Sequence, residues 1–159
     1  MLDRFLAYNL WANTRLVENI RSVPADTYAN LPLAPFGSMH ETLRHLVGAE
    51  TIWLDRVRGT SPADFMGITD GRSTDELLEM LLAASRSWVE LSTAPTGLPA
   101  EVTYATTKGD PFTQSVADLV LHVVNHSTYH RGQIMSLLRS VYDGRLGGLD
   151  MILFARTTR

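Results

Sequence analysis

Hydrophobic positions recur every three or four residues along four stretches of the chain, which predicts four amphipathic helices. Two of them begin with a capping box, in which a serine is followed three residues later by a glutamate: Ser38 opens one and Ser73 the other. The longest is expected to begin at Asp110, because the proline that follows suits the first helical turn. The expected helices span residues 3–21, 38–58, 73–91 and 110–142, with a short last helix over 150–156.

Only residues 101–106 alternate between polar and apolar side chains in the manner of a strand, and this segment is too short to form a sheet by itself. The connections between the expected helices are about 14 to 20 residues long, which favours crossovers over tight turns. No internal repeat or low-complexity tract interrupts the pattern. We therefore expect an all-α four-helix bundle with at most a minor β segment, in which residues 1–159 form a single domain.

Composition limits the chemistry that this bundle can carry. The 159 residues include 14 basic and 17 acidic side chains, and the net charge of -3 argues against binding to nucleic-acid phosphates. Because there is no cysteine, disulfides and thiolate ligands are excluded, and histidine and carboxylate remain as metal ligands. The N-terminus lacks a secretory signal and no stretch is apolar enough to cross a membrane, so the cytoplasm is the expected compartment.

Two histidines, His126 and His130, lie four residues apart on the last long helix, so both imidazoles leave the same face. A helical wheel puts both near the middle of the apolar stripe and His122 at its margin. Two neutral imidazoles one turn apart can bind one divalent ion. The alternative is that both are core histidines, each hydrogen-bonded to a neighbouring side chain. The stripe itself consists of Leu119, Val123, Ile134 and Leu137.

A third ligand is expected from the facing helix, which carries His40 and His45. His45 projects beside the apolar stripe, whereas His40 projects with charged residues and is expected at the surface. No glutamate follows His126, as it would in zinc proteases, and no helix carries the Glu-x-x-His pair of di-iron bundles. What remains is a site for one metal ion formed by His45, His126 and His130.

Three polar residues also fall on helix faces that are directed into the bundle: Asn9, Asn13 and Glu50. A buried carboxylate needs a partner. Glu50 is therefore expected either to orient a metal ligand or bound water, with Asn13 or Asn9, or to fix helix register by pairing with Arg56 or an asparagine. Trp11 points away from its own apolar stripe, which indicates a subunit contact or cover by a loop.

Several segments of the chain, in order, resemble the DinB-like or YfiT-like family of metalloenzymes. The resemblance covers nearly the whole chain, and its most specific part is the run from His122 to Ile134. It implies a four-helix bundle in an up-down-down-up arrangement, commonly assembled as a homodimer. The segments that carry it are residues 8–13, 38–46, 49–54 and 122–134.

The resemblance also implies a chemistry. Members of the family hold a divalent metal, nickel or zinc, with three histidines, which correspond here to His45, His126 and His130. Characterised relatives include thiol transferases that use low-molecular-weight thiols such as bacillithiol or mycothiol. The family name refers to a DNA-damage-inducible gene and implies no contact with DNA.

Three neutral histidines leave a divalent ion with open positions, where it lowers the pKa of a bound water and favours a thiolate over a thiol. We therefore expect a metal-dependent transferase that uses a low-molecular-weight thiol and a small-molecule substrate. A metal-dependent hydrolase is the alternative among enzymes, and a non-catalytic metal-binding helical protein is the alternative from another class. Arg131 directly follows a candidate ligand and is expected to point off the apolar stripe.

Overall fold

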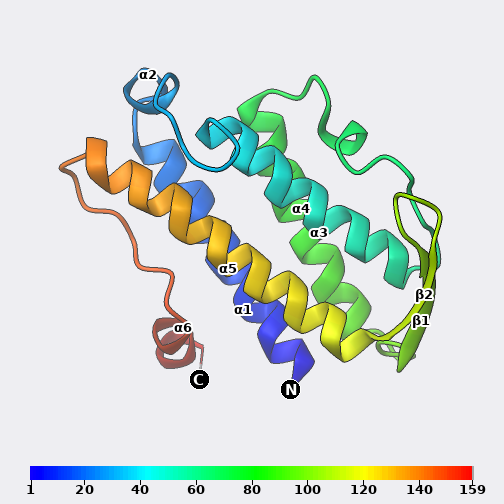
Figure 1. The fold of residues 1–159 in the computed structure, drawn as a ribbon. Helices are drawn as coiled ribbons and strands as arrows, with labels where there is room; N and C mark the ends of the chain where they lie inside the picture. The colour runs from blue at the N-terminus through cyan, green and yellow to red at the C-terminus, as the bar shows by residue number, and fades with distance from the viewer. Residues whose placement is uncertain (159) are drawn as a thin grey trace.

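Four long helices form a bundle in the computed structural model, which describes residues 1–158 (Figure 1). Helices α1 and α5 run in one direction, and α3 and α4 run in the opposite direction. Helix α1 contacts α4 and α5, and α3 contacts the same two helices from the other side, so the chain crosses the bundle diagonally twice. The expected up-down-down-up bundle is confirmed. Its helices are α1 Leu2–Ser22, α3 Met39–Val57, α4 Thr74–Thr93 and α5 Val116–Val141.

Short elements fill the connections between the long helices. A single helical turn, α2 (Ala25–Tyr28), and a 3-10 turn, η1 (Gly67–Thr69), were not expected from the pattern, since each is too short to show a period. The short last helix was expected, and α6 (Met151–Thr157) confirms it. Helix α6 packs its Phe154 ring against Trp11, with 5.7 Å between the ring centroids. Trp11 is therefore covered by the chain's own C-terminal segment.

The expected start of the last long helix is wrong by six residues. Residues Pro111–Ser115 form a strand, β2, that pairs antiparallel with β1 (Glu101–Ala105), and α5 begins at Val116. Proline is permitted both in the first turn of a helix and at the first position of a strand. Pro111 therefore does not distinguish a helix start from a strand start. The side chains of β2 are largely exposed, so no apolar stripe exists before Val116 that could pack as a helix.

The core has two apolar halves with a polar layer between them. On each long helix, residues from one hydrophobic cluster are separated from residues of the other by the buried polar positions. On α3, for example, Val47 belongs to one cluster, Leu54 to the other, and Glu50 lies between them. Although the helices have apolar faces, none within residues 1–158 is long and apolar enough to cross a membrane. The polar layer consists of Asn9, Asn13, Glu50, Ser85, Ser127 and Arg131.

Candidate metal centre

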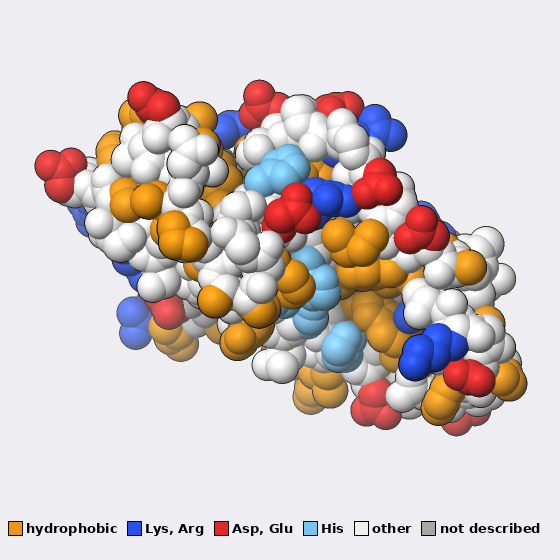
Figure 2. All heavy atoms as spheres, turned by 45° about the horizontal axis from the view of Figure 1, so that its top comes forward, with side chains coloured by type: hydrophobic (Ala, Val, Ile, Leu, Met, Phe, Trp, Pro, Cys, Tyr) orange, Lys and Arg blue, Asp and Glu red, His pale blue; other side chains and the backbone are white. Residues whose placement is uncertain are grey.

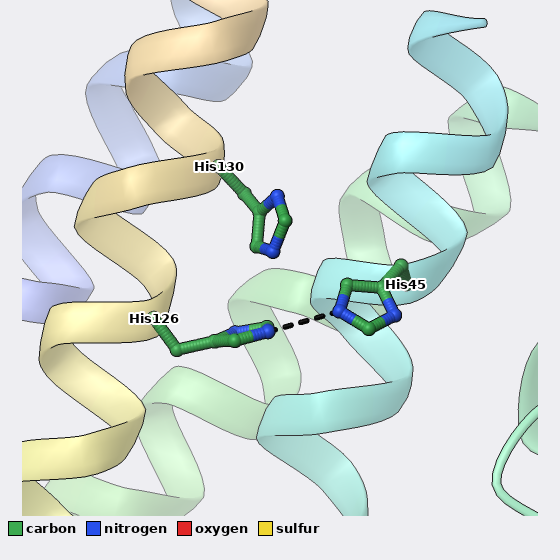
Figure 3. A group of neighbouring side chains, drawn as sticks. All are labelled: His45, His126 and His130. Carbon is green, nitrogen blue, oxygen red and sulfur yellow. Dashed lines mark hydrogen bonds between the residues drawn. The ribbon is translucent and has the colours of Figure 1, made fainter. Parts of the chain in front are cut away.

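The structure brings His45, His126 and His130 together between two helices. His126 and His130 project from successive turns of α5 toward His45 on α3 (Figure 3). One ring nitrogen from each residue lies within 4.8 Å of the others. The Nε2 atoms of His45 and His126 are 2.9 Å apart. The pair His126 and His130 and the single His45, which the sequence placed on separate helices, therefore meet in one cluster.

This geometry fits a divalent metal ion. Two nitrogens bound to one divalent ion at about 2.0–2.1 Å, with an angle of about 90–110° at the metal, lie about 2.8–3.4 Å apart. The separation between the Nε2 atoms of His45 and His126 lies in that range, and the His130 nitrogen lies within 4.8 Å of both. No cysteine or carboxylate joins this group among the described residues, so the donor set is three imidazoles. Such a set leaves further coordination positions for small ligands.

Burial keeps these histidines neutral. It lowers the pKa of His126 to about 3, with further lowering by the neighbouring His130, His45 and His122. Burial also lowers the pKa of His45 to about 4, and His130 adds to the effect. For His130 itself burial lowers the pKa, although its hydrogen bond to Gln133 opposes this. Neutral imidazoles can bind a metal ion at pH 7 without first losing a proton.

Gln133 fixes the tautomer of His130. Its Oε1 accepts a hydrogen bond of 2.7 Å from the His130 Nδ1, and its Nε2 donates to the carbonyl of Ala34 and to the hydroxyl of Tyr129. Because the amide oxygen can only accept, His130 carries its proton on Nδ1 and keeps a lone pair on Nε2. The sequence reasoning missed Gln133, although its position three residues after His130 places the two on the same helix face.

Aromatic side chains from two connections flank the histidines. The Phe36 ring stacks on His45 with 4.3 Å between centroids, and Phe65 meets the same imidazole edge-on at 5.3 Å. Phe36 precedes α3 and Phe65 follows it, so residues outside the helices enclose the cluster. The sequence pattern contained no signal for them, because loop residues have no period that shows which way they point.

A groove with a volume of about 500 Å³ lies beside the cluster, with His45 and His126 in its wall. Figure 2 shows histidine side chains at the bottom of a hollow, with hydrophobic side chains along its sides. The groove is large enough for a small organic molecule. Its other lining residues are Ala49, Ile52, Trp53, Arg56, Phe65, Tyr104, Thr106, Thr107 and His122.

Glu50 is fully buried in the polar layer and is hydrogen-bonded from three helices. Its Oε1 accepts from Asn9 at 2.8 Å, Asn13 at 2.7 Å and Ser127 at 2.8 Å, and its Oε2 accepts from Ser85 at 2.8 Å. Within residues 1–158, no hydrogen bond joins Glu50, Asn9 or Asn13 to the three histidines. Of the partners considered for Glu50, the asparagines are present and Arg56 is not.

Arg131 does not point off the apolar stripe, so that expectation is wrong. Its side chain is 98% buried and donates to the Oδ1 atoms of Asn9 (2.6 Å) and Asn13 (2.8 Å), and to Thr128 (2.8 Å). The two asparagine amides thus link Arg131 to Glu50, because they donate to the carboxylate and accept from the guanidinium. A helical wheel treats arginine as polar and assigns it to the surface. It does not show that buried acceptors on other helices can pair with the guanidinium.

The remaining two histidines are not part of the three-nitrogen cluster, although the His122 ring lies beside that of His126, with 5.7 Å between their centroids. His40 bonds through Nδ1 to the Thr74 hydroxyl at 3.0 Å and is half-buried, so it contacts α4 rather than lying fully at the surface as expected. His122 lies one turn before His126, is exposed, and forms part of the groove wall. The helical wheels therefore separated the clustered histidines from the others correctly.

With this geometry established, comparison with known proteins identifies the family. The DinB family model matches residues 1–141, which is most of the chain. The chain belongs to the DinB family. The match includes all three clustered histidines and ends at the last residue of α5, before α6. The resemblance inferred from the sequence segments is thereby confirmed.

A curated relative matches this chain over most of the length of both proteins. Protein DinB of Bacillus subtilis (strain 168) is 24% identical over 139 residues, which cover 83% of this chain and 81% of the relative. No solved structure matches the chain. Membership of the DinB family and the three-histidine cluster are together compatible with metal binding.

Proposed function

We propose that this DinB-family protein is a metal-dependent enzyme in which His45, His126 and His130 hold a divalent ion, nickel or zinc. The observation that carries the proposal is the convergence of three neutral imidazole nitrogens within 4.8 Å at the edge of a groove. A divalent ion with three imidazole ligands and open positions supplies a Lewis acid that lowers the pKa of a water or a thiol.

The chain's own residues would prepare this site in distinct ways. Gln133 keeps the His130 lone pair directed at the cluster, and Phe36 covers one face of His45. Ser127 and Arg131, each next to a clustered histidine in sequence, bond into the polar layer and so hold α5 at one rotation about its axis. These contacts keep the imidazoles oriented before any ligand binds, which reduces the cost of binding.

For the reaction, we propose transfer of a low-molecular-weight thiol to an electrophilic small molecule. The groove volume of about 500 Å³ gives room for an organic molecule beside the ion. The apolar and aromatic lining also suits the body of an organic molecule. The homodimer implied by the family resemblance is a separate proposal, which the mass in solution would test.

Metal analysis of untagged protein tests the ligand set. We expect about one equivalent of divalent metal in the wild type, and loss of that metal in His45→Ala, His126→Ala and His130→Ala variants. His40→Ala is the matched control, because it removes a histidine of the same helix α3 that bonds Thr74 instead. Metal retained at full occupancy in all three cluster variants would show that the ion is held elsewhere.

A rate comparison then tests the reaction class. Metal-loaded protein is assayed with several small thiols and a chlorinated aromatic acceptor, and separately with an activated ester in the absence of thiol. The proposal expects thiol conjugation that disappears in His126→Ala and persists in His40→Ala. Ester hydrolysis without conjugation would favour a hydrolase, and neither activity in fully loaded protein would favour a binding protein.

A further inference from the structure

Arg56 is a buried arginine without an anionic partner. It lies in the last turn of α3 with 6% of its surface exposed, and its Nε is buried without a hydrogen-bond partner. No ion pair within residues 1–158 includes it. Buried arginines are usually paired with acceptors, as Arg131 is in this molecule. Arg56 therefore differs from the other buried guanidinium.

Aromatic rings hold the Arg56 guanidinium in place. Its Cζ lies 4.5 Å from the centroid of Trp53 and 4.8 Å from that of Tyr104, and these two rings meet edge-on. Tyr104 belongs to β1, and its hydroxyl donates to Gln114 on the paired strand β2. The rings and the carboxyl end of α3 stabilise a positive charge. The rings, however, offer no ordinary acceptor to a guanidinium that has five N–H donors.

The same groove is lined by Arg56 and by two of the clustered histidines, His45 and His126. His45, Ala49 and Arg56 follow one another along one face of α3, so Arg56 and His45 are separated by about 16 Å along the helix axis. Side chains tilt toward the helix N-terminus, which brings the long arginine back toward the histidines. Apolar residues such as Ile52 lie between the two ends of the groove. A ligand that reaches both ends needs an apolar body and a terminal anion.

We propose that Arg56 binds the carboxylate of an organic monoanion in this groove. Of the described residues that line the groove, Arg56 carries the only permanent charge, so the metal-free groove balances one negative charge rather than the two of a phosphate monoester. The planar fork of a guanidinium matches a carboxylate with two parallel hydrogen bonds. Binding of the anion is independent of the metal. That the bound carboxylate belongs to the substrate rests on the function proposed above.

Calorimetric titration with 4-phenylbutanoate tests the inference, with 4-phenylbutanamide as the neutral isostere. Protein stripped of metal with EDTA is used, so that the carboxylate cannot bind an ion at the histidines. We expect the carboxylate to bind the wild type about 10- to 100-fold more tightly than the amide. Arg56→Gln should remove that preference, and Arg56→Lys should retain only part of it.

Arg58→Gln is the matched control, since it removes an exposed arginine of the same helix end and changes the net charge equally. It should leave affinity within about twofold of the wild type. Equal affinity for carboxylate and amide, or no saturable binding of either, overturns the inference even if the Arg56 variants fail to fold. Saturable binding of inorganic phosphate but not of the carboxylate also overturns it. Because metal is absent throughout, failure of the metal proposal leaves this result interpretable.

Discussion

Glu50 holds a negative charge in the centre of the bundle, with every hydrogen bond supplied by a neighbouring helix. Four side-chain donors contact its two oxygens, and Arg131 compensates the charge through Asn9 and Asn13. A buried charge with a complete set of partners is tolerated, whereas removal of one partner leaves another buried and unpaired. The contacts thus favour a role for Glu50 in helix register.

Glu50→Gln should lower the free energy of unfolding by about 3–5 kcal/mol, because Arg131 would be left without a buried counter-charge. Urea unfolding measures the change. Glu79→Gln is the control, since Glu79 pairs with Arg21 and its side chain is 61% exposed, and it should cost less than about 1 kcal/mol. Equal losses in the two variants would contradict a structural role.

The same Glu50→Gln variant separates the two roles considered for the carboxylate. If Glu50 fixes register alone, the folded variant should bind divalent metal with about the wild-type affinity. A neighbour that orients a metal ligand typically changes affinity by about 10- to 100-fold. A loss of that size in folded protein would assign Glu50 to the metal site after all.

The clustered histidines make the stability of the metal-free protein depend on pH. The pKa of His45 is lowered to about 4 and that of His126 to about 3, from 6.5 in the unfolded chain. Between these values the unfolded chain binds more protons than the folded one, so the free energy of unfolding should fall as pH falls below 6.5. Urea unfolding of EDTA-treated protein at about pH 7, 6 and 5 measures this slope, and His126→Asn should reduce it. An unchanged slope in His126→Asn would count against neutral burial.

Among the elements, the long helices follow from sequence and the connections between them do not. Ser38 and Ser73 accept hydrogen bonds from the backbone three residues later, so both mark true helix starts. Only Ser73 has a complete capping box, because the Glu76 side chain accepts from its backbone N–H whereas Glu41 bonds Arg44. The hairpin was missed because strand β2 contains no buried alternation and gains its stability from pairing with β1. The side-chain pattern within one strand does not show which segment that strand pairs with, even when the partner follows after a short turn.

Two glycines inside helices offer a matched test of packing around α3 and α5. A Cβ at Gly132 on α5 would meet no atom within 4 Å, whereas a Cβ at Gly48 on α3 would lie 3.3 Å from both the ring and the carbonyl oxygen of Phe65. Gly132→Ala should therefore raise the free energy of unfolding by about 0.5–1 kcal/mol, through helix propensity alone.

Gly48→Ala should raise the free energy of unfolding by less than Gly132→Ala does, or should lower it, because Phe65 must move to admit the methyl group. Thermal or urea unfolding of both variants measures the difference. Since Phe65 also contacts His45, a shift of Phe65 should appear in the imidazole resonances of His45 in Gly48→Ala only. An equal gain in both glycine variants would mean that the connection around Phe65 is loosely packed.

At the scale of the whole molecule, periodicity was enough to predict the bundle and the three clustered histidines. Each of those histidines lies on a long helix, where rotation per residue assigns a face. Arg131 was misplaced by the same wheel, because its burial depends on acceptors from α1 that no single-helix pattern reveals. Phe36 and Phe65 reach the site from connections, and Arg56 of α3 meets Tyr104 of the hairpin, so only the folded chain shows these contacts.

A bound ion should stabilise the whole fold, since its ligands come from α3 and α5 on adjacent corners of the bundle. Free metal at about 100 times its dissociation constant adds about 2.7 kcal/mol, which corresponds to a rise in Tm of about 5–10 °C for a chain of this size. Differential scanning calorimetry with nickel and with zinc measures the rise. The rise should vanish in His45→Ala and persist in His40→Ala, and its survival in His45→Ala would refute the ligand set.

The polar layer has a consequence for anyone who wishes to transplant the three histidines into another bundle. On α5, Ser127 and Arg131 each follow a clustered histidine, so the turn of helix that presents the imidazoles is locked by bonds on its adjacent face. A slide of α5 by one turn would strand Glu50 and Arg131 in apolar surroundings as well as separate the imidazoles. A graft of the three histidines alone would reproduce their spacing but not the hydrogen bonds that fix the rotation of α5. The smallest portable unit is the histidine cluster together with Glu50, Arg131 and the two asparagines, Asn9 and Asn13, that link them.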